Sequence, residues 1–382
     1  MGKVTVRSKL KKRRRPRSHD RLPPSIKRLP LGLFHKDLLG WYDRHHRDLP
    51  WRRTHDPYAI FISEMMLQQT QVKTVLPYYE RWIRVLPSWR SLDRAPMDRV
   101  LKLWEGLGYY RRARNLKAAA RMVMSDFGGK LPDNTETILR LPGVGPYSAG
   151  AILSIAFNRP TPVVDGNVIR VFARLFAIPG DLKTGAGSQK IWRLAEYLLP
   201  HQRPGDFNQA LMELGATLCL PTDPHCTSCP LTSQCRAKRV GRTGHYPSPS
   251  KKPATQTVFM AAALVRKDGK ILLRKRPEEA RWWKGLWEFP SAEGTRPSEA
   301  FTRLKKDLGL ELLPEPIAQI RHQVTHHKID LRLYQNVPTR KRIVCPSSIW
   351  VVPGVRLRHP LSSAHLRLWR RIMVDRKFIE FL

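Results

Sequence analysis

The chain has 382 residues, of which 41% are hydrophobic and 9% are aromatic. At about 100–200 residues per domain this length predicts two or three domains, and the composition excludes a wholly disordered protein. The longest apolar run, Val258 to Val265, is far shorter than the roughly 20 residues of a membrane-spanning helix. The N-terminus lacks an apolar stretch of the signal-peptide type. We therefore expect an intracellular protein without a membrane-spanning segment.

Charge narrows the class of partner. The chain carries 69 Lys and Arg against 31 Asp and Glu, a formal net charge of +38. Such an excess repels itself unless a polyanion offsets it, and nucleic acid is the leading candidate, ahead of a membrane surface and an acidic protein. Residues 1–30 contribute +11, from 12 basic residues and Asp20. The remaining +27 belongs to the rest of the chain, so the N-terminal tail alone does not explain the basicity.

Residues 1–30 are predicted to be a disordered basic arm, because the block Lys11–Arg15 repels itself and stays extended. The leading interpretation is a solvated tail that adds non-specific DNA affinity. A nuclear-localisation signal has the same composition, and a mitochondrial presequence fits less well.

Residues 31–240 are predicted to be all-α. Apolar residues recur there at intervals of three and four, and Pro and Gly residues such as Pro77, Pro87 and Pro132 separate the periodic segments. The predicted helices cover residues 34–42, 60–72, 98–104, 113–124, 148–157, 168–177 and 190–199.

A linker rich in Pro, Ser, Gly and Lys at 241–256 precedes a change of character. Residues 257–382 are predicted to form a small α+β domain, so the fold class is multidomain. The expected strands are 258–265, 271–273, 317–324, 329–335 and 349–352, and the expected helices are 298–308 and 362–374.

Four of the five cysteines cluster near the end of the helical region with the spacing C-x6-C-x2-C-x5-C; they are Cys219, Cys226, Cys229 and Cys235. A disulfide framework would spread its cysteines and prefer an even number. Four thiolates close in sequence suit zinc or an iron–sulfur cluster. A zinc ribbon usually shows two C-x-x-C pairs and this segment has one, so we favour iron–sulfur over zinc and over four unliganded cysteines.

A glycine-containing turn separates two predicted helical segments and reads Leu141-Pro-Gly-Val-Gly-Pro-Tyr-Ser-Ala-Gly150. Gly143 and Gly145, on either side of Val144, permit a tight turn with exposed backbone N–H groups, and the next helix adds its positive N-terminus. This helix–hairpin–helix pattern can hold a DNA phosphate without a basic side chain. An ordinary turn between helices is the alternative.

These motifs together make the chain resemble the adenine DNA glycosylase (MutY-type) family, within the helix–hairpin–helix superfamily that also includes endonuclease III. The resemblance covers about residues 31–375. Besides the hairpin and the cysteine loop at 219–235, it rests on Leu49-Pro-Trp-Arg52, Ser63-Glu-Met-Met-Leu-Gln-Gln-Thr-Gln71, Gly106-Leu-Gly-Tyr-Tyr110 and Val164-Asp-Gly-Asn167. The family implies excision of adenine mispaired with 8-oxoguanine or guanine in base excision repair, and a 4Fe–4S cluster on the four cysteines.

Two carboxylates are the candidates for chemistry. Glu64 lies in an apolar predicted helix, on the face of Ile60 and Leu67, and burial would raise its pKa and keep it protonated, as a general acid requires. An exposed helix glutamate is the alternative. The resemblance makes Glu64 the acid that assists departure of adenine. Asp165 is predicted from the sequence to be a helix cap. The resemblance places its carboxylate, with Asn167 of the same motif, beside the sugar, where it stabilises oxocarbenium character.

Tyr147 indicates the reaction class. In the bifunctional endonuclease III branch, a lysine in this part of the hairpin attacks C1′. Here the residue is Tyr147, and a phenol with a pKa near 10 does not form a Schiff base. The resemblance therefore implies removal of the base without cleavage of the backbone, although Tyr147 would also suit packing of the hairpin.

Extrusion of a base requires a side chain that fills the gap. By resemblance, Gln69 is this wedge, and Tyr109, after Leu107 and Gly108, is the aromatic ring beside 8-oxoguanine. A packing motif at a helix end is the alternative for Tyr109. The positions that match the family's adenine pocket are Arg47, Trp51, Arg52, Leu67 and Gln209.

Residues 257–382 resemble the Nudix-like domain of the same family. Counting back from Gly309, Arg303, Lys306 and Asp307 occupy the positions where a Nudix box has its magnesium-binding carboxylates. Two of these three residues are basic, so we expect the domain to recognise its ligand and not to hydrolyse it. The family reads 8-oxoguanine with a Phe-Ser-His loop between two strands. This chain has Val324-Thr325-His326: Thr325 and His326 keep the hydroxyl and the imidazole, whereas Val324 loses the aromatic ring. A surface β-hairpin is the alternative.

The leading interpretation is a monomeric, monofunctional adenine glycosylase that acts on double-stranded DNA, in the cytoplasm of a bacterium or the nucleus of a eukaryote. An endonuclease III-like lyase on oxidised pyrimidines is disfavoured by Tyr147, Glu64 and the C-terminal domain. A Nudix nucleotide hydrolase is disfavoured by Arg303 and Lys306. A non-catalytic iron–sulfur DNA-binding protein would require Glu64 to be dispensable.

Overall fold

The computed structural model describes residues 26, 29–248, 254–339, 343, 345–355 and 357–374. Most of the predicted arm at 1–30, and residues 249–253 of the predicted linker, therefore lie outside the described residues. The chain divides into two compact units. The first contains the described residues up to Arg47 together with those from Ala149 to residue 248, and the second contains Asp48–Ser148 together with the described residues from 254 onward.

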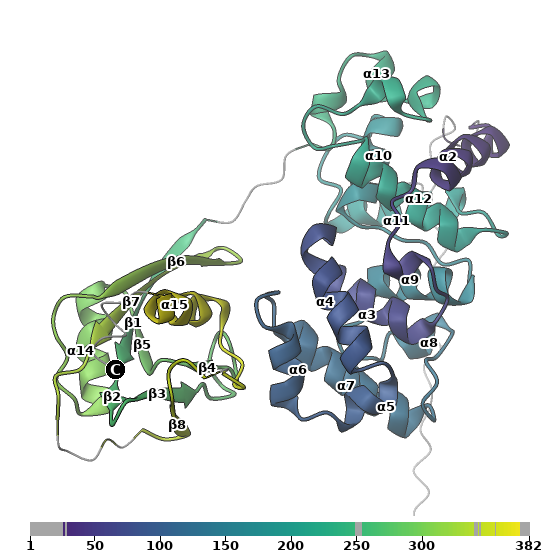
Figure 1. Ribbon diagram of the computed structural model, residues 1–382. Helices are drawn as coiled ribbons and strands as arrows, with labels where there is room; N and C mark the ends of the chain where they lie inside the picture. The colour runs from purple at the N-terminus through teal and green to yellow at the C-terminus, as the bar shows by residue number, and fades with distance from the viewer. Residues whose placement is uncertain are drawn as a thin grey trace, which may run out of the picture. The chain divides into compact units, whose positions relative to one another are not determined.

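The first unit is helical (Figure 1). Its core lies between α2 (Leu31–His45), α10 (Gly166–Leu175) and α12 (Pro204–Thr217), where Phe34, Phe172 and Phe207 are completely buried. The other elements are most of α9 (Pro146–Phe157), α11 (Gly185–Leu198), α13 (Arg236–Arg239), and the short 3₁₀ turns η3 (Cys226–Ser228), η4 (Thr232–Gln234) and η5 (Thr243–His245).

The helical part of the second unit is built around α3 (Pro57–Leu67). Asp56 caps α3 by accepting hydrogen bonds from the backbone N–H groups of Tyr58 and Ala59, and all residues from Tyr58 to Met66 are buried. A helix that is apolar on every side is stable only when it is surrounded by other elements. These are η2 (Pro50–Arg52), α4 (Val72–Val85), α5 (Trp89–Arg94), α6 (Met97–Trp104), α7 (Arg111–Asp126), α8 (Thr135–Ile138) and the start of α9.

The helix predicted at 60–72 is wrong at its C-terminal end. The structure ends α3 at Leu67 and begins α4 at Val72, because the intervening turn has Gln69 in the left-handed conformation at φ 55°. The predicted break at Pro77 is also wrong, because this proline lies inside α4. An internal proline costs about 3 kcal/mol, and burial of Val75, Tyr79 and Trp82 on one face outweighs this cost at about 1.5–3 kcal/mol per large apolar side chain.

The C-terminal part of the second unit is a mixed α/β structure. One sheet has the strand order β5-β1-β7-β6, with β1 (Gln256–Leu264) parallel to β7 (His327–Gln335) and the other pairs antiparallel. A second sheet pairs β3 (Lys270–Lys275) with β2 (Arg266–Lys267), β4 (Trp287–Glu288) and β8 (Ser348–Val351). The remaining elements are β5 (Ser291–Gly294), β6 (Ala318–Val324), α14 (Pro297–Leu308) and α15 (Ser363–Val374).

Alternation along β1 divides the core of this part into two clusters. Ala261 and Ala263 face a cluster that contains α14, whereas Met260 and Ala262 face a cluster that contains β3 and α15. Successive side chains of a strand point to opposite faces, so the sheet is covered on both sides, as Figure 1 shows. The prediction of an all-α region followed by an α+β region is confirmed.

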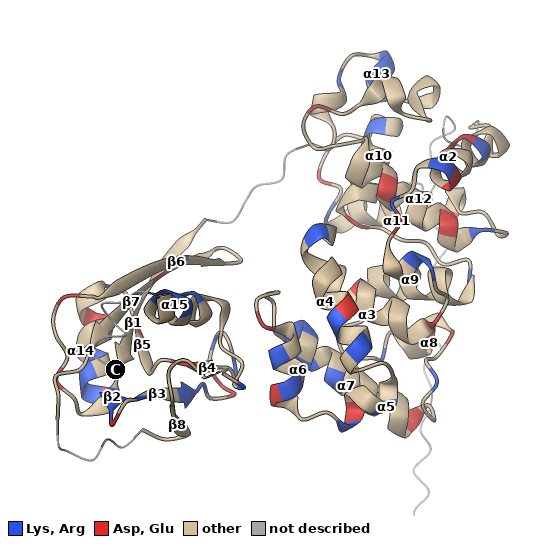
Figure 2. Ribbon diagram, in the orientation of Figure 1, with Lys and Arg blue, Asp and Glu red and all other residues tan. Residues whose placement is uncertain are grey.

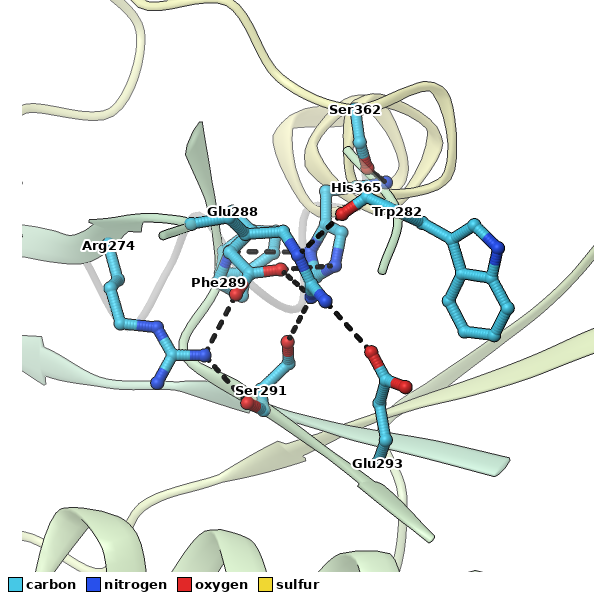
Figure 3. A network of polar contacts seen from close by, with 9 residues as sticks. Arg274, Trp282, Glu288, Phe289, Ser291, Glu293, Ser362 and His365 are labelled. Carbon is cyan, nitrogen blue, oxygen red and sulfur yellow. Dashed lines mark hydrogen bonds and ion pairs between the residues drawn. The ribbon is translucent and has the colours of Figure 1, made fainter. Parts of the chain in front are cut away.

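A buried ionic network fixes the centre of this C-terminal part (Figure 3). Glu288 is fully buried and accepts hydrogen bonds from Arg274 at 2.8 Å and Arg276 at 2.7 Å. Burial opposes ionisation of Glu288, but the two guanidinium groups outweigh it and lower its pKa. Burial lowers the pKa of the neighbouring His365 to about 4, so this imidazole is neutral near pH 7. The network joins β3, β4 and α15, and Arg276 extends it to Glu293 of β5.

Candidate active site and cysteine cavity

Glu64 lies on α3 and is 4% exposed. Its position in the apolar run Ile60–Met66 explains this burial, as the sequence predicts. The hydroxyl of Tyr147 donates a hydrogen bond of 3.1 Å to Oε2 of Glu64 across 83 residues of sequence. The structure therefore brings together two of the predicted catalytic residues within the second unit.

The hairpin that presents Tyr147 is fixed at two points. Gly143 has φ 84°, and a Cβ atom there would lie 2.6 Å from Nδ2 of Asn115 and 2.8 Å from Cε of Met65. Glycine is therefore required both for the turn and for its close approach to α3. Gln68, just after α3, donates hydrogen bonds to Ser148 Oγ at 2.9 Å and to the Gly143 carbonyl at 3.4 Å. Gln68 and Ser148 were not predicted as site residues, because their contact spans 80 residues.

The two predicted DNA-contacting side chains on turns are exposed. Gln69 follows the C-terminal end of α3, and Tyr109 follows α6 and is 46% exposed. Both have positive φ, 55° and 48°, a conformation uncommon for residues other than glycine. Leu107 beside them is buried, and Gly108 has φ 77°.

Asp165 caps α10 in the first unit, which confirms the cap predicted from the sequence. Its Oδ1 accepts a hydrogen bond of 2.7 Å from the backbone N–H of Val168, and its Oδ2 accepts one of 2.9 Å from Nδ2 of Asn167. Burial raises the pKa of Asp165 above its ordinary value, although these hydrogen bonds oppose the shift. Asp165 and Asn167 lie in the first unit, whereas Glu64 and Tyr147 lie in the second.

The four clustered cysteines line one cavity of about 30 Å³. Burial raises the pKa of the Cys229 thiol to about 12 and that of Cys235 in the same direction. Among the described residues, no group of three or more His, Cys, Asp or Glu is arranged as a metal site. All four sulfur-bearing side chains nevertheless face one small space, so the donor set fits a group held by thiolates. Cys345 lies elsewhere, against the α14 side of the C-terminal sheet.

Two arginines on α10 hold the cysteine loop in place. Arg174 is 3% exposed, lies 3.4 Å from Sγ of Cys219, and donates to the carbonyls of Leu220 and Pro221. Arg170 donates to the Cys219 carbonyl at 2.7 Å and to Oδ1 of Asn167 at 2.8 Å. Neither arginine was predicted as a functional residue, because the loop carbonyls to which they donate lie more than 40 residues away in the sequence.

The residues matched to an adenine pocket are distributed over both units. Arg47 in the first unit binds the buried carboxylate of Glu213 on α12 at 2.7 and 2.8 Å. Gln209 lies on the same helix and is half-buried. In the second unit, Trp51 is buried against Tyr79 with a ring separation of 5.1 Å, and Arg52 and Leu67 are half-buried. The role of Glu213 was not predicted, because no helix was predicted at the position of α12.

Thr325 and His326 form the two-residue turn between β6 and β7, where Val324 pairs with His327. Both are exposed, and Thr325 has φ 52°. The Thr325 hydroxyl donates to the Val324 carbonyl at 2.7 Å. On α14, Arg303, Lys306 and Asp307 are exposed, and Arg303 and Asp307 line a cavity of about 690 Å³ beside the Glu288 network.

Lys and Arg residues are spread over the helices of both units and the C-terminal part (Figure 2). This distribution agrees with the expectation that the basic charge is not confined to the N-terminal tail. In the part of the chain that the structure describes, no helix combines the length and apolar character needed to cross a membrane.

Comparisons with known proteins assign two domain families to this chain. A family model described as "HhH-GPD superfamily base excision DNA repair protein" matches residues 62–196, and a NUDIX domain model matches residues 260–371. The chain is 40% identical over 402 residues to the adenine DNA glycosylase of Homo sapiens, covering 88% of this chain and 73% of the human protein. It is 36% identical over 275 residues to that of Buchnera aphidicola subsp. Acyrthosiphon pisum, covering 72% and 78%.

Among solved structures, a thermostable thymine-DNA glycosylase is similar to about half of this chain. The TM-score is 0.51 at 33% sequence identity, and the match covers 55% of this chain and 97% of that one. The matches to the two curated glycosylases cover more of this chain than the structural match does. The chain therefore belongs to the adenine DNA glycosylase family, whose members are DNA-binding N-glycosylases of base excision repair.

Proposed function

We propose that this enzyme excises adenine paired with 8-oxoguanine or guanine, with Glu64 as the general acid and Asp165 as the carboxylate that stabilises the sugar. The observation that carries the proposal is the buried Glu64 carboxyl with the Tyr147 hydroxyl 3.1 Å from its Oε2. Adenine is a poor leaving group until it is protonated, and a carboxyl positioned in a buried site suits proton transfer to it.

Asp165 has a complementary role in this proposal. Departure of the base leaves positive charge on the sugar, and an ionised carboxylate lowers the energy of that state. The hydrogen bonds from Val168 and Asn167 hold the carboxylate of Asp165 in one orientation. Such fixed orientation supports electrostatic stabilisation, because the group need not reorganise during the reaction.

The enzyme is proposed to be monofunctional. Formation of a Schiff base needs an amine, and the hairpin presents the phenol of Tyr147 instead. The product is then an abasic site in an intact strand. This distinguishes the proposal from the alternative of an endonuclease III-like lyase.

The C-terminal part is proposed to recognise the base opposite adenine. The exposed turn of Thr325 and His326 offers a hydroxyl and an imidazole for the edge of 8-oxoguanine. Arg303 and Lys306 stand where the resemblance expects magnesium-binding carboxylates, which supports recognition without hydrolysis. The side chains of Gln69 and Tyr109 are proposed to fill the gap left by the extruded adenine and to stack beside its partner.

We further propose a 4Fe–4S cluster on Cys219, Cys226, Cys229 and Cys235. The single small cavity that all four line supports this assignment. The cluster would hold the loop between α12 and α13 as a cross-link of the fold. Purified protein should contain about four irons per chain and absorb visible light, and one zinc per chain without such absorbance would contradict the assignment.

One assay tests the function as a whole. The enzyme is incubated with duplexes that carry adenine opposite 8-oxoguanine, adenine opposite guanine, or thymine glycol, each analysed with and without alkali. We expect cleavage of the first two only after alkali, by a monomer acting on double-stranded DNA. Cleavage of the thymine glycol duplex without alkali would support the lyase alternative. Because the substrate is cellular DNA, we expect an intracellular protein.

A further inference from the structure

Arg112 is a buried cation without a carboxylate partner. It is the second residue of α7 and is 6% exposed, and in the described part of the chain no Asp or Glu pairs with it. Burial lowers its pKa to about 10, so the guanidinium is still charged at neutral pH. A buried charge is costly unless hydrogen bonds replace its hydration. The hydrogen-bond acceptors of this guanidinium therefore show which segments of the chain it holds together.

These acceptors belong to two separate turns. Nη1 donates to the carbonyls of Met66 at 2.7 Å and Met65 at 3.3 Å, and also to the carbonyl of Gln68. Nη2 donates to Oγ1 of Thr70 at 3.0 Å and to the Gly108 carbonyl at 3.2 Å. The last carbonyls of a helix lack partners within it, and a cation there is favourable. One planar group thus joins the end of α3 to the turn after α6.

Each of these turns contains a strained residue. Gln69 and Tyr109 have φ of 55° and 48°, and for side chains other than glycine this conformation costs about 1–3 kcal/mol. Glycine would remove the cost, but the chain has two large side chains there. Such a conformation persists only when surrounding contacts hold it. Arg112 supplies contacts on both sides of Gln69 and one immediately before Tyr109, whose ring lies 5.5 Å from the guanidinium carbon.

We propose that Arg112 is a positioning residue that holds Gln69 and Tyr109 in their exposed, left-handed conformations before DNA binds. The inference rests on the proposed roles of these two side chains at the mispair. It deepens that function, because it assigns the orientation of both side chains to one buried group. Pre-ordering both turns removes an entropic cost that binding would otherwise bear, and misplacement by about 1 Å can cost 10²-fold in rate.

The test is a set of double-mutant cycles on the full-length enzyme. Arg112→Met removes the charge and all five donated hydrogen bonds. Arg112→Lys keeps the charge, but a single ammonium group replaces the two guanidinium nitrogens that bind the two turns. Each change is made in the wild type, in Gln69→Ala and in Tyr109→Ala. The readouts are the single-turnover rate of adenine excision opposite 8-oxoguanine, duplex affinity, and the melting temperature. The matched control is Arg111→Met, because Arg111 precedes Arg112 on the same helix and is exposed.

We expect Arg112→Met to slow excision by about 10- to 100-fold, and Arg112→Lys to restore only part of this loss. In the Gln69→Ala and Tyr109→Ala backgrounds, the same substitution should cost clearly less than in the wild type, since one of the two side chains that it positions is already gone. Arg111→Met at low salt should leave the saturated rate unchanged.

Additive effects in both cycles would overturn the proposal, since a general structural role multiplies every rate by the same factor. So would a wild-type rate in Arg112→Lys. If Arg112→Met does not fold, the Arg112→Lys cycles decide alone. Failure of the proposed function is seen separately, as a wild-type enzyme that does not release adenine from the mispaired duplexes.

Discussion

Glu64 and Asp165 are held by opposite means, although both are carboxyl groups proposed for one reaction. Glu64 lies inside a helix whose residues from Tyr58 to Met66 are all buried. It accepts a hydrogen bond from the hydroxyl of Tyr147, which lies 83 residues away in the sequence. Asp165 lies at the start of a helix and is held by donors two and three residues further along the chain. A group fixed by its tertiary surroundings and a group fixed by local backbone respond differently to substitution, so the comparison can be tested.

The largest effect is expected at Glu64. Glu64→Gln keeps the size of the side chain but removes the proton donor, so adenine release should fall by at least about 10³-fold, within the range of general acid catalysis. Duplex affinity should stay similar. Single-turnover excision opposite 8-oxoguanine measures the change. A residual rate within about tenfold of wild type, roughly 1.4 kcal/mol of barrier, would contradict the acid role.

Two substitutions of Asp165 should separate the effect of its charge on the rate from the effect of its helix cap on stability. Asn caps helices about as well as Asp, whereas Ala costs about 1 kcal/mol. Asp165→Asn should therefore keep the melting temperature and lose about 10²-fold in rate, and Asp165→Ala should lose both. Equal rates for wild type and Asp165→Asn would show that the residue serves only as a cap.

The pH dependence of Asp165 has a definite sign. Burial raises its pKa in the folded protein, and the proposed role needs the ionised form. Excision that depends on Asp165 should therefore fall as pH drops through a value above that of an ordinary aspartate, and Asp165→Asn should lack this limb. For stability the sign is the reverse: the stabilising contribution of the protonated form is present at low pH and is lost as pH rises through the folded pKa. Denaturation of wild type and Asp165→Asn at several pH values measures this difference.

Tyr147→Phe tests the long-range contact that the tertiary structure provides to Glu64. It removes the hydroxyl that donates to Glu64 but keeps the ring that fills the hairpin. Glu64 becomes a carboxylate as it gives up its proton, and a hydrogen bond to a charged group contributes about 1.5–3 kcal/mol. We therefore expect about a tenfold or larger loss of rate with an unchanged melting temperature. An unchanged rate would assign Tyr147 to packing alone.

The smallest effect is expected at the C-terminal turn. Thr325→Ala with His326→Ala removes two exposed groups from a turn that the strands on either side hold, so folding should not change. Loss of polar contacts worth about 1–3 kcal/mol predicts at least a fivefold loss of preference for 8-oxoguanine over guanine. The ratio of the two excision rates is the measurement, and the rate opposite guanine is its internal control. An unchanged ratio would place recognition of the partner base elsewhere.

Local sequence determined a large part of this protein. The apolar run around Glu64 predicted its burial, the spacing of Asp165 before an apolar segment predicted its cap, and Gly143 predicted the hairpin turn. The sequence also predicted β1, β6 and β7 close to their observed bounds. These features depend on residues within about four positions of each other, where periodicity and capping act.

Other features depended on contacts between distant segments, which only the tertiary structure decided. The left-handed turn that follows α3 is held by Arg112, which lies 44 residues from Gln68. The passage of α4 through Pro77 and the pairing of Arg47 with Glu213 also depend on packing and contacts between distant segments. The same holds for the Tyr147 hydroxyl at Glu64 and for the carbonyls that surround Arg112. An arginine looks the same in a sequence whether it is solvated or buried, because its environment is set by the chain that folds around it, and the free energy of that packing outweighs local propensity.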